Sequence, residues 1–294
     1  MSFSSISQML SESDKNQLPL WKTILQDNLA EQGGTEENFF TRMQLMWTAM
    51  QESSKNYKAE DRSNSGLTGG DGAKVFYASQ KGLLFGDSFL NEIITEALKV
   101  SECNACMKRI VATPTAGSCG VLPAILLPLK HRDLFPDDSF VKALFVAAGF
   151  GQVIAQRASI AGAYGGCQAE IGTASAMGAV ALVSLKGGTN EMCANACAVA
   201  LSNLMGLVCD PVAGLVEVPC VNRNVIGAMN ALSCANLALS NIQSRIPPDE
   251  VIDAMNEVGE EMNPDLKETG KGGLAGTPTG CRIAQKLFEE KDYS

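Results

Sequence analysis

The chain of 294 residues contains a single histidine, His131, in the segment LKHRDLFPDD, which we expect to form a surface turn. One histidine leaves no cluster of imidazole ligands for a metal ion and little provision for a histidine general base. Aromatic residues make up only 6% and charged residues 19% of the sequence, whereas 46% of the residues are hydrophobic and 28 are glycine. Small and aliphatic side chains therefore carry the apolar content, which is typical of a closely packed globular protein and not of a disordered one.

Basic residues are also in the minority, with 23 lysines and arginines against 32 acidic residues and a net charge of -9. This balance argues against nucleic acid or an anionic membrane as a partner. The apolar runs at 110–129 and 192–209 are interrupted by prolines or by polar residues, so neither is predicted to span a membrane. Because no basic stretch followed by an apolar one stands at the N-terminus, no secretory signal is predicted and we expect a cytoplasmic protein.

The hydrophobic pattern predicts a mainly α-helical fold. Two amphipathic segments lie within residues 1–51, and long alanine-rich stretches without the alternation of β-strands lie at 139–164, 173–185, 192–208 and 226–243. Asp87 or Ser88 is a candidate cap for a helix, and PPDEVIDAMNEVGEEM has the proline and acidic residues of a helix start. We expect an N-terminal helical segment with a polar connection at 1–64 and a helical domain at 65–294.

Glycine- and proline-rich segments interrupt the helical pattern at four places. Loops of this composition let the backbone approach a ligand closely and present amide N–H groups to anions. We expect the active site to be built from these loops, which are TPTAGSCG at 113–120, GAYGGC at 162–167, CDPVAGLVEVPC at 209–220 and KGGLAGTPTG at 271–280.

Ten cysteines without a secretory signal are expected to stay reduced. Cys103 and Cys106 form a C-x-x-C pair, but the sequence offers neither a second ligand pair for zinc nor the preceding strand of a thioredoxin-like motif. Cys193, Cys197 and Cys234 lie in alanine-rich helical stretches and are interpreted as core residues.

Three further cysteines, Cys167, Cys209 and Cys220, each stand beside a glycine or proline break. Thiolate ligands are often presented from irregular backbone, where several segments can reach one metal or cluster. Spacing alone leaves two readings open, a soft-metal site and three buried structural thiols. With so little histidine, thiolate is the available soft ligand if the protein binds a metal.

Four segments together resemble a known family, the alpha subunit of the iron-sulfur-dependent bacterial L-serine dehydratase. The resemblance covers the chain from about residue 65 to residue 280. GGCQAEIG and CDPVAGLVEVPC carry most of its specificity when they occur together. The segments are ATPTAGSCGVLPA at 112–124, GGCQAEIGTASAMGA at 165–179, LVCDPVAGLVEVPCVNRN at 207–224 and ETGKGGLAGTPTG at 268–280.

The resemblance implies that Cys167, Cys209 and Cys220 hold a 4Fe-4S cluster with one iron left free for substrate. That iron would act as a Lewis acid on the hydroxyl group of L-serine, which is deaminated to pyruvate and ammonia. Residues 65–294 would then form the iron-sulfur catalytic domain of a lyase of amino-acid degradation. By the same resemblance, the candidates for substrate contacts are Thr113, Thr115, Gly117 and Ser118. Lys74, in the glycine-rich turn at 65–74, is a further candidate.

Two departures from the family pattern bear on the active site. Relatives that are a single chain end in a cysteine that can occupy the open iron, whereas this sequence ends in Ser294 and its nearest candidate is Cys281, which we interpret as a helix-start residue. Relatives also carry a beta region with histidines and serines, so we expect a separate beta subunit as a partner and name no proton acceptor in this chain.

Other functions remain as alternatives. A similar cluster could serve a cysteine desulfidase acting on L-cysteine, or a redox sensor or scaffold subunit without turnover. A pyridoxal-phosphate dehydratase could use TAGSCG as a phosphate loop, but it needs a Schiff-base lysine in an α/β setting that the helical pattern does not provide.

Overall fold

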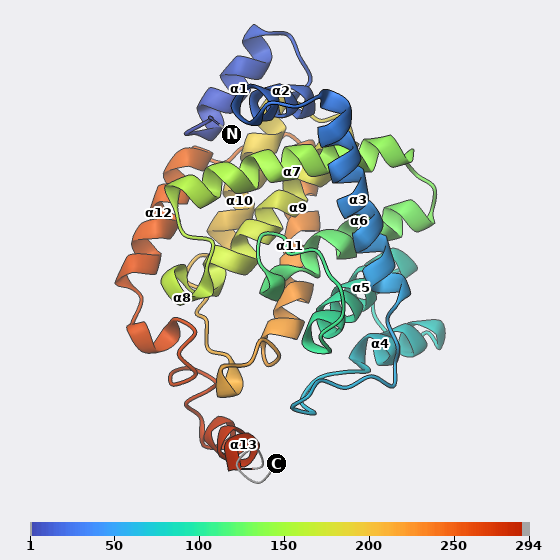
Figure 1. Ribbon diagram of the computed structural model, residues 1–294, viewed down its shortest axis with the longest axis vertical. Helices are drawn as coiled ribbons and strands as arrows, with labels where there is room; N and C mark the ends of the chain where they lie inside the picture. Colours follow the sequence, from blue (N-terminus) through green and yellow to red (C-terminus); the bar gives the residue numbers. More distant parts are fainter. Residues whose placement is uncertain (1, 290–294) are drawn as a thin grey trace.

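The computed structural model describes residues 2–289 and places helix α9, Thr173–Leu185, at the centre of the protein (Figure 1). Of its 13 residues 11 are buried, so this helix is covered on all sides. Helices α7 (Asp137–Arg157), α10 (Asn190–Leu204) and α11 (Cys220–Leu239) pack against it. Gly178 is required for this packing, because a Cβ atom there would lie 2.7 Å from Ile125 Cδ1 and 3.1 Å from Ala231 Cβ.

The remaining helices surround this centre. Within residues 2–289 the structure contains no β-strand and only one isolated β-bridge, between Cys209 and Lys267. The prediction of a mainly α-helical fold is therefore confirmed. The bounds of the other helices are α1 Ile6–Lys15, α2 Leu20–Gln32, α3 Glu36–Lys55, α4 Asp71–Gln80, α5 Ser88–Ala105, α6 Val121–His131, α8 Gly162–Gly165, α12 Pro248–Glu261 and α13 Pro278–Glu289.

Helix starts follow the local sequence signals. The side chain of Asp87 caps α5 by accepting a hydrogen bond from the backbone N–H of Leu90, and α12 begins with Pro248 and two acidic residues in its first turn. The bounds differ from the expected ones where an alanine-rich stretch runs on into a loop. Helix α7 ends at Arg157 and not near residue 164, and His131 is the last residue of α6 and not part of a turn.

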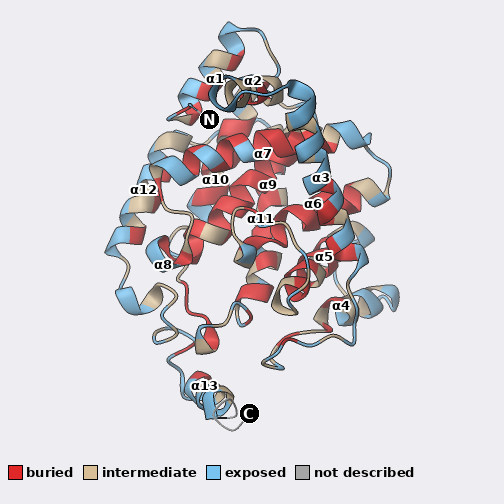
Figure 2. Ribbon diagram, viewed as in Figure 1, coloured by how far each residue is buried: buried red, intermediate tan, exposed pale blue. Residues whose placement is uncertain are grey.

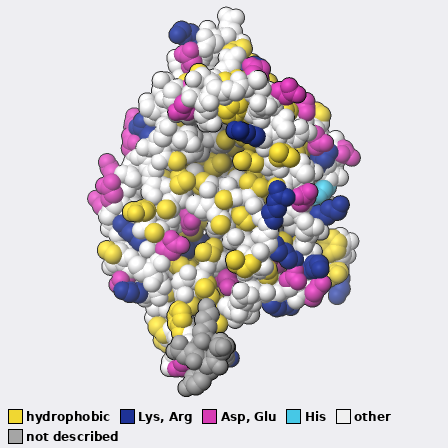
Figure 3. Space-filling model, in the orientation of Figure 1, with side chains coloured by type: hydrophobic (Ala, Val, Ile, Leu, Met, Phe, Trp, Pro, Cys, Tyr) yellow, Lys and Arg dark blue, Asp and Glu magenta, His cyan; other side chains and the backbone are white. Residues whose placement is uncertain are grey.

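The buried residues concentrate in α5, α6, α7 and α9, and the inward faces of α10 and α11 join them (Figure 2). The N-terminal helices join the same core, since the Trp47 ring of α3 stacks on Phe140 of α7 with centroids 4.8 Å apart. Helix α7 is the one described helix long and apolar enough to cross a membrane, but 67% of its apolar window is buried inside the protein, as in a core helix. Acidic and basic side chains are interspersed on the face seen in Figure 3.

Candidate active site

The three cysteines singled out in the sequence come from three different segments. Cys167 follows the short helix α8 and precedes a π-helical turn, Gln168–Gly172 (η2), which continues into α9. Cys209 lies in the extended segment after α10, and Cys220 is the first residue of α11. Their exposed fractions are 3%, 3% and 9%. π-helical turns are rare in proteins as a whole, but those that occur are often found at functional sites.

The three thiols lie within electrostatic reach of one another. Burial is the main cause that raises the pKa of Cys167 and of Cys220 to about 12. Burial also raises the pKa of Cys209, and the neighbouring Cys167 raises the pKa of both Cys209 and Cys220 further. The fold therefore brings the three thiols together and favours their neutral form. A metal must displace the protons of these thiols, because it binds thiolates.

Arg223 lies one helical turn after Cys220 on α11 and connects the cysteine-bearing segments. Its Nη1 donates to the carbonyl of Val208 at 2.7 Å, and its Nη2 donates to Asp210 Oδ1 at 2.7 Å. The guanidinium also hydrogen-bonds the Cys167 thiol, and its positive charge lowers the pKa of that thiol against the effect of burial. A cation beside a sulfur atom stabilises the thiolate that a metal requires.

Glu170 projects from the π-helical turn toward two of the glycine-rich loops. A Cβ atom built on Gly162 would lie 2.8 Å from Cys209 Sγ and 3.0 Å from Glu170 Oε2. A Cβ atom on Gly117 would lie 3.5 Å and 3.6 Å from the two carboxylate oxygens of Glu170. Burial raises the pKa of this carboxyl group, the Thr115 hydroxyl lowers it, and the negative charge of Glu268 raises it. Glu170 is therefore a site residue, which the sequence reasoning missed.

The loop TPTAGSCG folds around a short 3-10 turn, Ala116–Ser118 (η1). The loop is fixed to α11 by Asn224, whose Nδ2 donates to the carbonyl of Gly117 at 2.8 Å and whose Oδ1 accepts from the N–H of Gly120 at 2.9 Å. No hydrogen bond within residues 2–289 uses the N–H groups of Ala116 and Gly117. The loop is thus rigidly placed and keeps two amide donors available.

The predicted substrate contacts in this loop occupy different environments. The Ser118 hydroxyl is buried and donates to the carbonyl of Thr113 at 3.0 Å, so the loop itself engages it. Thr113 lines a mainly apolar cavity of about 670 Å³ together with residues such as Met46 of α3 and Leu144 of α7, and its buried hydroxyl has no hydrogen-bond partner among the described residues. Only Thr115 and Gly117 face Glu170. The roles of all four remain predictions.

The segment before α4 contacts the loop that connects Cys209 to Cys220, whereas Lys74 does not. Ser63 and Ser65 both donate to Glu217 Oε2, at 2.6 Å and 2.7 Å, and Glu217 lies between Cys209 and Cys220. The ammonium group of Lys74 is exposed and pairs with Asp71 at 2.7 Å on the same helix. Within residues 2–289, Lys74 forms no hydrogen bond or ion pair with the cysteine-bearing segments. Its role as a substrate contact stays a prediction.

The C-terminal segment closes over Cys209. The N–H of Cys209 donates to the carbonyl of Leu266, and the N–H of Glu268 donates to the carbonyl of Cys209, both at 2.8 Å. The second oxygen of Asp210 accepts from the N–H of Leu274 at 2.7 Å. Cys281 lies in the first turn of α13 with an exposed side chain whose sulfur contacts the carbonyl of Ala275 at 3.7 Å.

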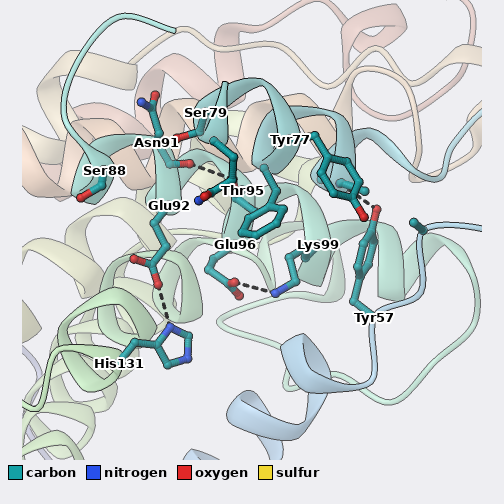
Figure 4. Close-up of a pocket in the computed structure, with 15 residues that line it drawn as sticks. Tyr57, Tyr77, Ser79, Ser88, Asn91, Glu92, Thr95, Glu96, Lys99 and His131 are labelled. Atoms are coloured by element: carbon teal, nitrogen blue, oxygen red, sulfur yellow. Dashed lines mark hydrogen bonds and ion pairs between the residues drawn. The ribbon is translucent and has the colours of Figure 1, made fainter. Parts of the chain in front are cut away.

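A separate cavity of about 500 Å³ is lined largely by α4 and α5 (Figure 4). Its charged side chains pair with each other, Glu96 with Lys99 at 2.6 Å and Glu92 with His131 at 2.7 Å. None of the cysteines lines this cavity, and we assign no ligand to it.

The fold and the site together define a mainly helical protein in which irregular segments gather three buried thiols, an arginine and a carboxylate. Residues 15–275 match the family model described as "Serine dehydratase alpha chain". The chain belongs to this family, as the sequence motifs predicted.

Relatives with this description align along most of the chain. The chain is 42% identical to the "Probable L-serine dehydratase, alpha chain" of Bacillus subtilis over 286 residues, which are 97% of this chain and 95% of the relative. The protein of the same name from Latilactobacillus sakei is 54% identical over 197 residues, 67% of this chain and 94% of the relative. The "L-serine dehydratase, alpha chain" of Peptoniphilus asaccharolyticus is 40% identical over 277 residues, 94% of each chain.

Proposed function

We propose that this chain is the alpha subunit of an L-serine dehydratase and deaminates L-serine to pyruvate and ammonia. The observation that carries the proposal is the meeting of Cys167, Cys209 and Cys220 in one buried group, in a chain of the serine dehydratase alpha chain family. Two relatives that align along nearly their whole length carry this activity in their names.

The donor set fits an iron-sulfur cluster held by Cys167, Cys209 and Cys220. Within residues 2–289, no three His, Cys, Asp or Glu side chains are arranged around a single metal ion. The fit rests on donor chemistry, since iron-sulfur clusters are held by cysteine thiolates and three cysteine side chains are neighbours here. When bound, a 4Fe-4S cluster with one iron free of protein ligands supplies a Lewis acid for the substrate hydroxyl.

Arg223 and the closing segments would prepare these thiols for the cluster. The hydrogen bond from the Arg223 guanidinium to Cys167 favours the thiolate form of that residue. The backbone of residues 266–268 fixes Cys209 on both sides through its N–H and its carbonyl. Burial of the three side chains limits the access of water to the bound group.

The loop at 113–118 would orient the substrate. The unused N–H groups of Ala116 and Gly117 can donate to the substrate carboxylate, as the sequence motif TPTAGSCG predicts. Removal of the α proton and loss of the hydroxyl as water convert serine to 2-aminoacrylate, which tautomerises to the imine and hydrolyses to pyruvate and ammonia. His131 lies on the surface, paired with Glu92, so we propose that a beta subunit supplies the proton acceptor.

The test is to prepare the protein together with its beta subunit, without oxygen, and to measure iron, sulfide and the pyruvate formed from L-serine. Cys167→Ser, Cys209→Ser and Cys220→Ser should each lose cluster and activity, whereas Cys103→Ser and Cys193→Ser, at buried thiols elsewhere, should keep both. Equal losses in all five variants, or an iron-free protein that still deaminates serine, would refute the proposal.

The same preparation separates the alternatives. Release of sulfide from L-cysteine at a higher kcat/KM than deamination of L-serine would identify a cysteine desulfidase. A cluster whose spectrum responds to oxidants but not to L-serine would identify a redox sensor.

A further inference from the structure

Two carboxylates beside the cysteine-bearing segments, Asp210 and Glu170, differ in their partners. Asp210 is neutralised by Arg223 and also accepts the N–H of Leu274. Glu170 is half-buried, and among residues 2–289 it forms no ion pair with a lysine, arginine or histidine. A desolvated carboxylate without a cation is costly for a folded protein. Within the described residues, the Glu170 carboxyl group is therefore left without a cationic partner.

This unpaired charge lies where the substrate would lie. Glu170 faces Gly117 of the loop at 113–118 and, together with the sulfur of Cys209, faces Gly162. The available N–H groups of Ala116 and Gly117 belong to the same loop. Amide donors and a carboxylate acceptor thus stand side by side next to a cysteine of the proposed cluster.

An amino acid carries its ammonium group and its carboxylate on one carbon atom. A site that binds both groups therefore needs an acceptor for the ammonium group next to the N–H donors that bind the carboxylate. We propose that the Glu170 carboxylate binds the α-ammonium group of the substrate and selects amino acids over carboxylic acids without an amine. The assignment rests on the proposed function, and it gives the site a specificity that the hydroxyl and carboxylate contacts alone do not supply.

Two ligands that differ only in the ammonium group test this assignment directly. L-alanine and propionate both lack the hydroxyl, so the ratio of their dissociation constants reports the ammonium contact independently of dehydration. The measurement is calorimetry, without oxygen, on the cluster-loaded protein as it is isolated. Glu170→Gln keeps the size of the side chain and removes its charge, and Glu257→Gln, at an exposed position of α12, removes one charge elsewhere.

We expect the unmodified protein to bind L-alanine roughly 10- to 100-fold more tightly than propionate, the range for a hydrogen bond between charged groups. Glu170→Gln should bring this ratio close to one and should raise the KM for L-serine by a similar factor while retaining iron and sulfide. Glu257→Gln should change neither quantity.

Three results would overturn the assignment. The first is a Glu170→Gln variant that keeps the alanine preference. The second is a kcat that collapses while the KM for L-serine stays unchanged, because this would make Glu170 a proton acceptor. The third is equal or undetectable binding of both ligands by the unmodified protein. Failure of the unmodified protein, assayed together with its beta subunit, to deaminate L-serine would instead refute the proposed function, so the two failures are distinguishable.

Discussion

Replacing Arg223 by methionine tests whether this residue holds the cysteine-bearing segments together. The side chains of Arg223 and Asp210 are only 11% and 5% exposed, and the ion pair between them is 2.7 Å long. Methionine retains most of the length of the side chain but none of its donors. The variant would leave the carbonyl of Val208 without its side-chain donor and would leave Asp210 a buried charge held only by the N–H of Leu274.

The magnitude follows from this unpaired charge. Removing one partner of a buried ion pair lowers the free energy of unfolding by about 3–5 kcal/mol. An unfolding entropy of about 2.1 cal/mol/K per residue gives about 0.6 kcal/mol per degree for a chain of this length, so the Tm should fall by about 5–8 °C. The metal-free chain is the right material, because cluster loss then adds nothing to the shift.

Two further variants show whether the reasoning is right. Arg157 pairs with the half-exposed Asp253 at 2.6 Å and also donates to the carbonyl of Ser4 at 3.3 Å. Because its ion pair is open to solvent, Arg157→Met should cost about 1 kcal/mol, less than Arg223→Met. The double variant Arg223→Met with Asp210→Asn removes the buried charge as well and should recover part of the loss. Thermal unfolding followed by circular dichroism measures all three. A Tm shift for Arg223→Met no larger than that for Arg157→Met would refute the argument.

Three other predictions follow from the same structure. The metal-free chain should lose stability as the pH rises from 9 to about 12, because folding raises the pKa of the Cys167 thiol from 9.0 to about 12, whereas the same thiol ionises near pH 9 in the unfolded chain. Urea unfolding at several pH values measures this loss, and a flat profile would contradict it. Glu102→Ala should destabilise the chain by about 1–3 kcal/mol, because the buried Glu102 carboxylate accepts the N–H of Asp71 at the start of α4 at 2.7 Å, and an unchanged urea midpoint would exclude this cap. Gly162→Ala should lower the iron content of the reconstituted protein, because the added Cβ would lie 2.8 Å from Cys209 Sγ, and full iron loading would show that the loop can move aside.

The helices could be predicted because their signals are local. The alanine-rich pattern at 173–185 coincides with α9, and the cap at Asp87 and the proline at Pro248 mark helix starts by short-range chemistry alone. The end of α7 could not be predicted in this way. Its alanine-rich stretch continues into the segment that leads to α8, and which part remains helical depends on tertiary packing.

The site was only partly accessible from the sequence. Glycine and proline breaks singled out Cys167, Cys209 and Cys220, but the same reasoning missed Glu170 and Arg223. Arg223 had one signal, since it is the only arginine in the apolar motif at 207–224 and stands three residues after a cysteine at a helix start. Glu170 had none beyond its place in GGCQAEIG, because a π-helical turn sets its direction and this turn is not a property of local composition.

The sequence by itself determined that this protein is mainly helical and predicted that its chemistry resides in four irregular loops, since helix propensity, caps and backbone freedom act within a few residues. Tertiary structure alone decided which charges meet. It paired Asp210 with Arg223 and, within residues 2–289, left Glu170 beside Cys209 without a cation. These contacts join residues from different elements, and their energies depend on burial, which exists only once the helices have packed.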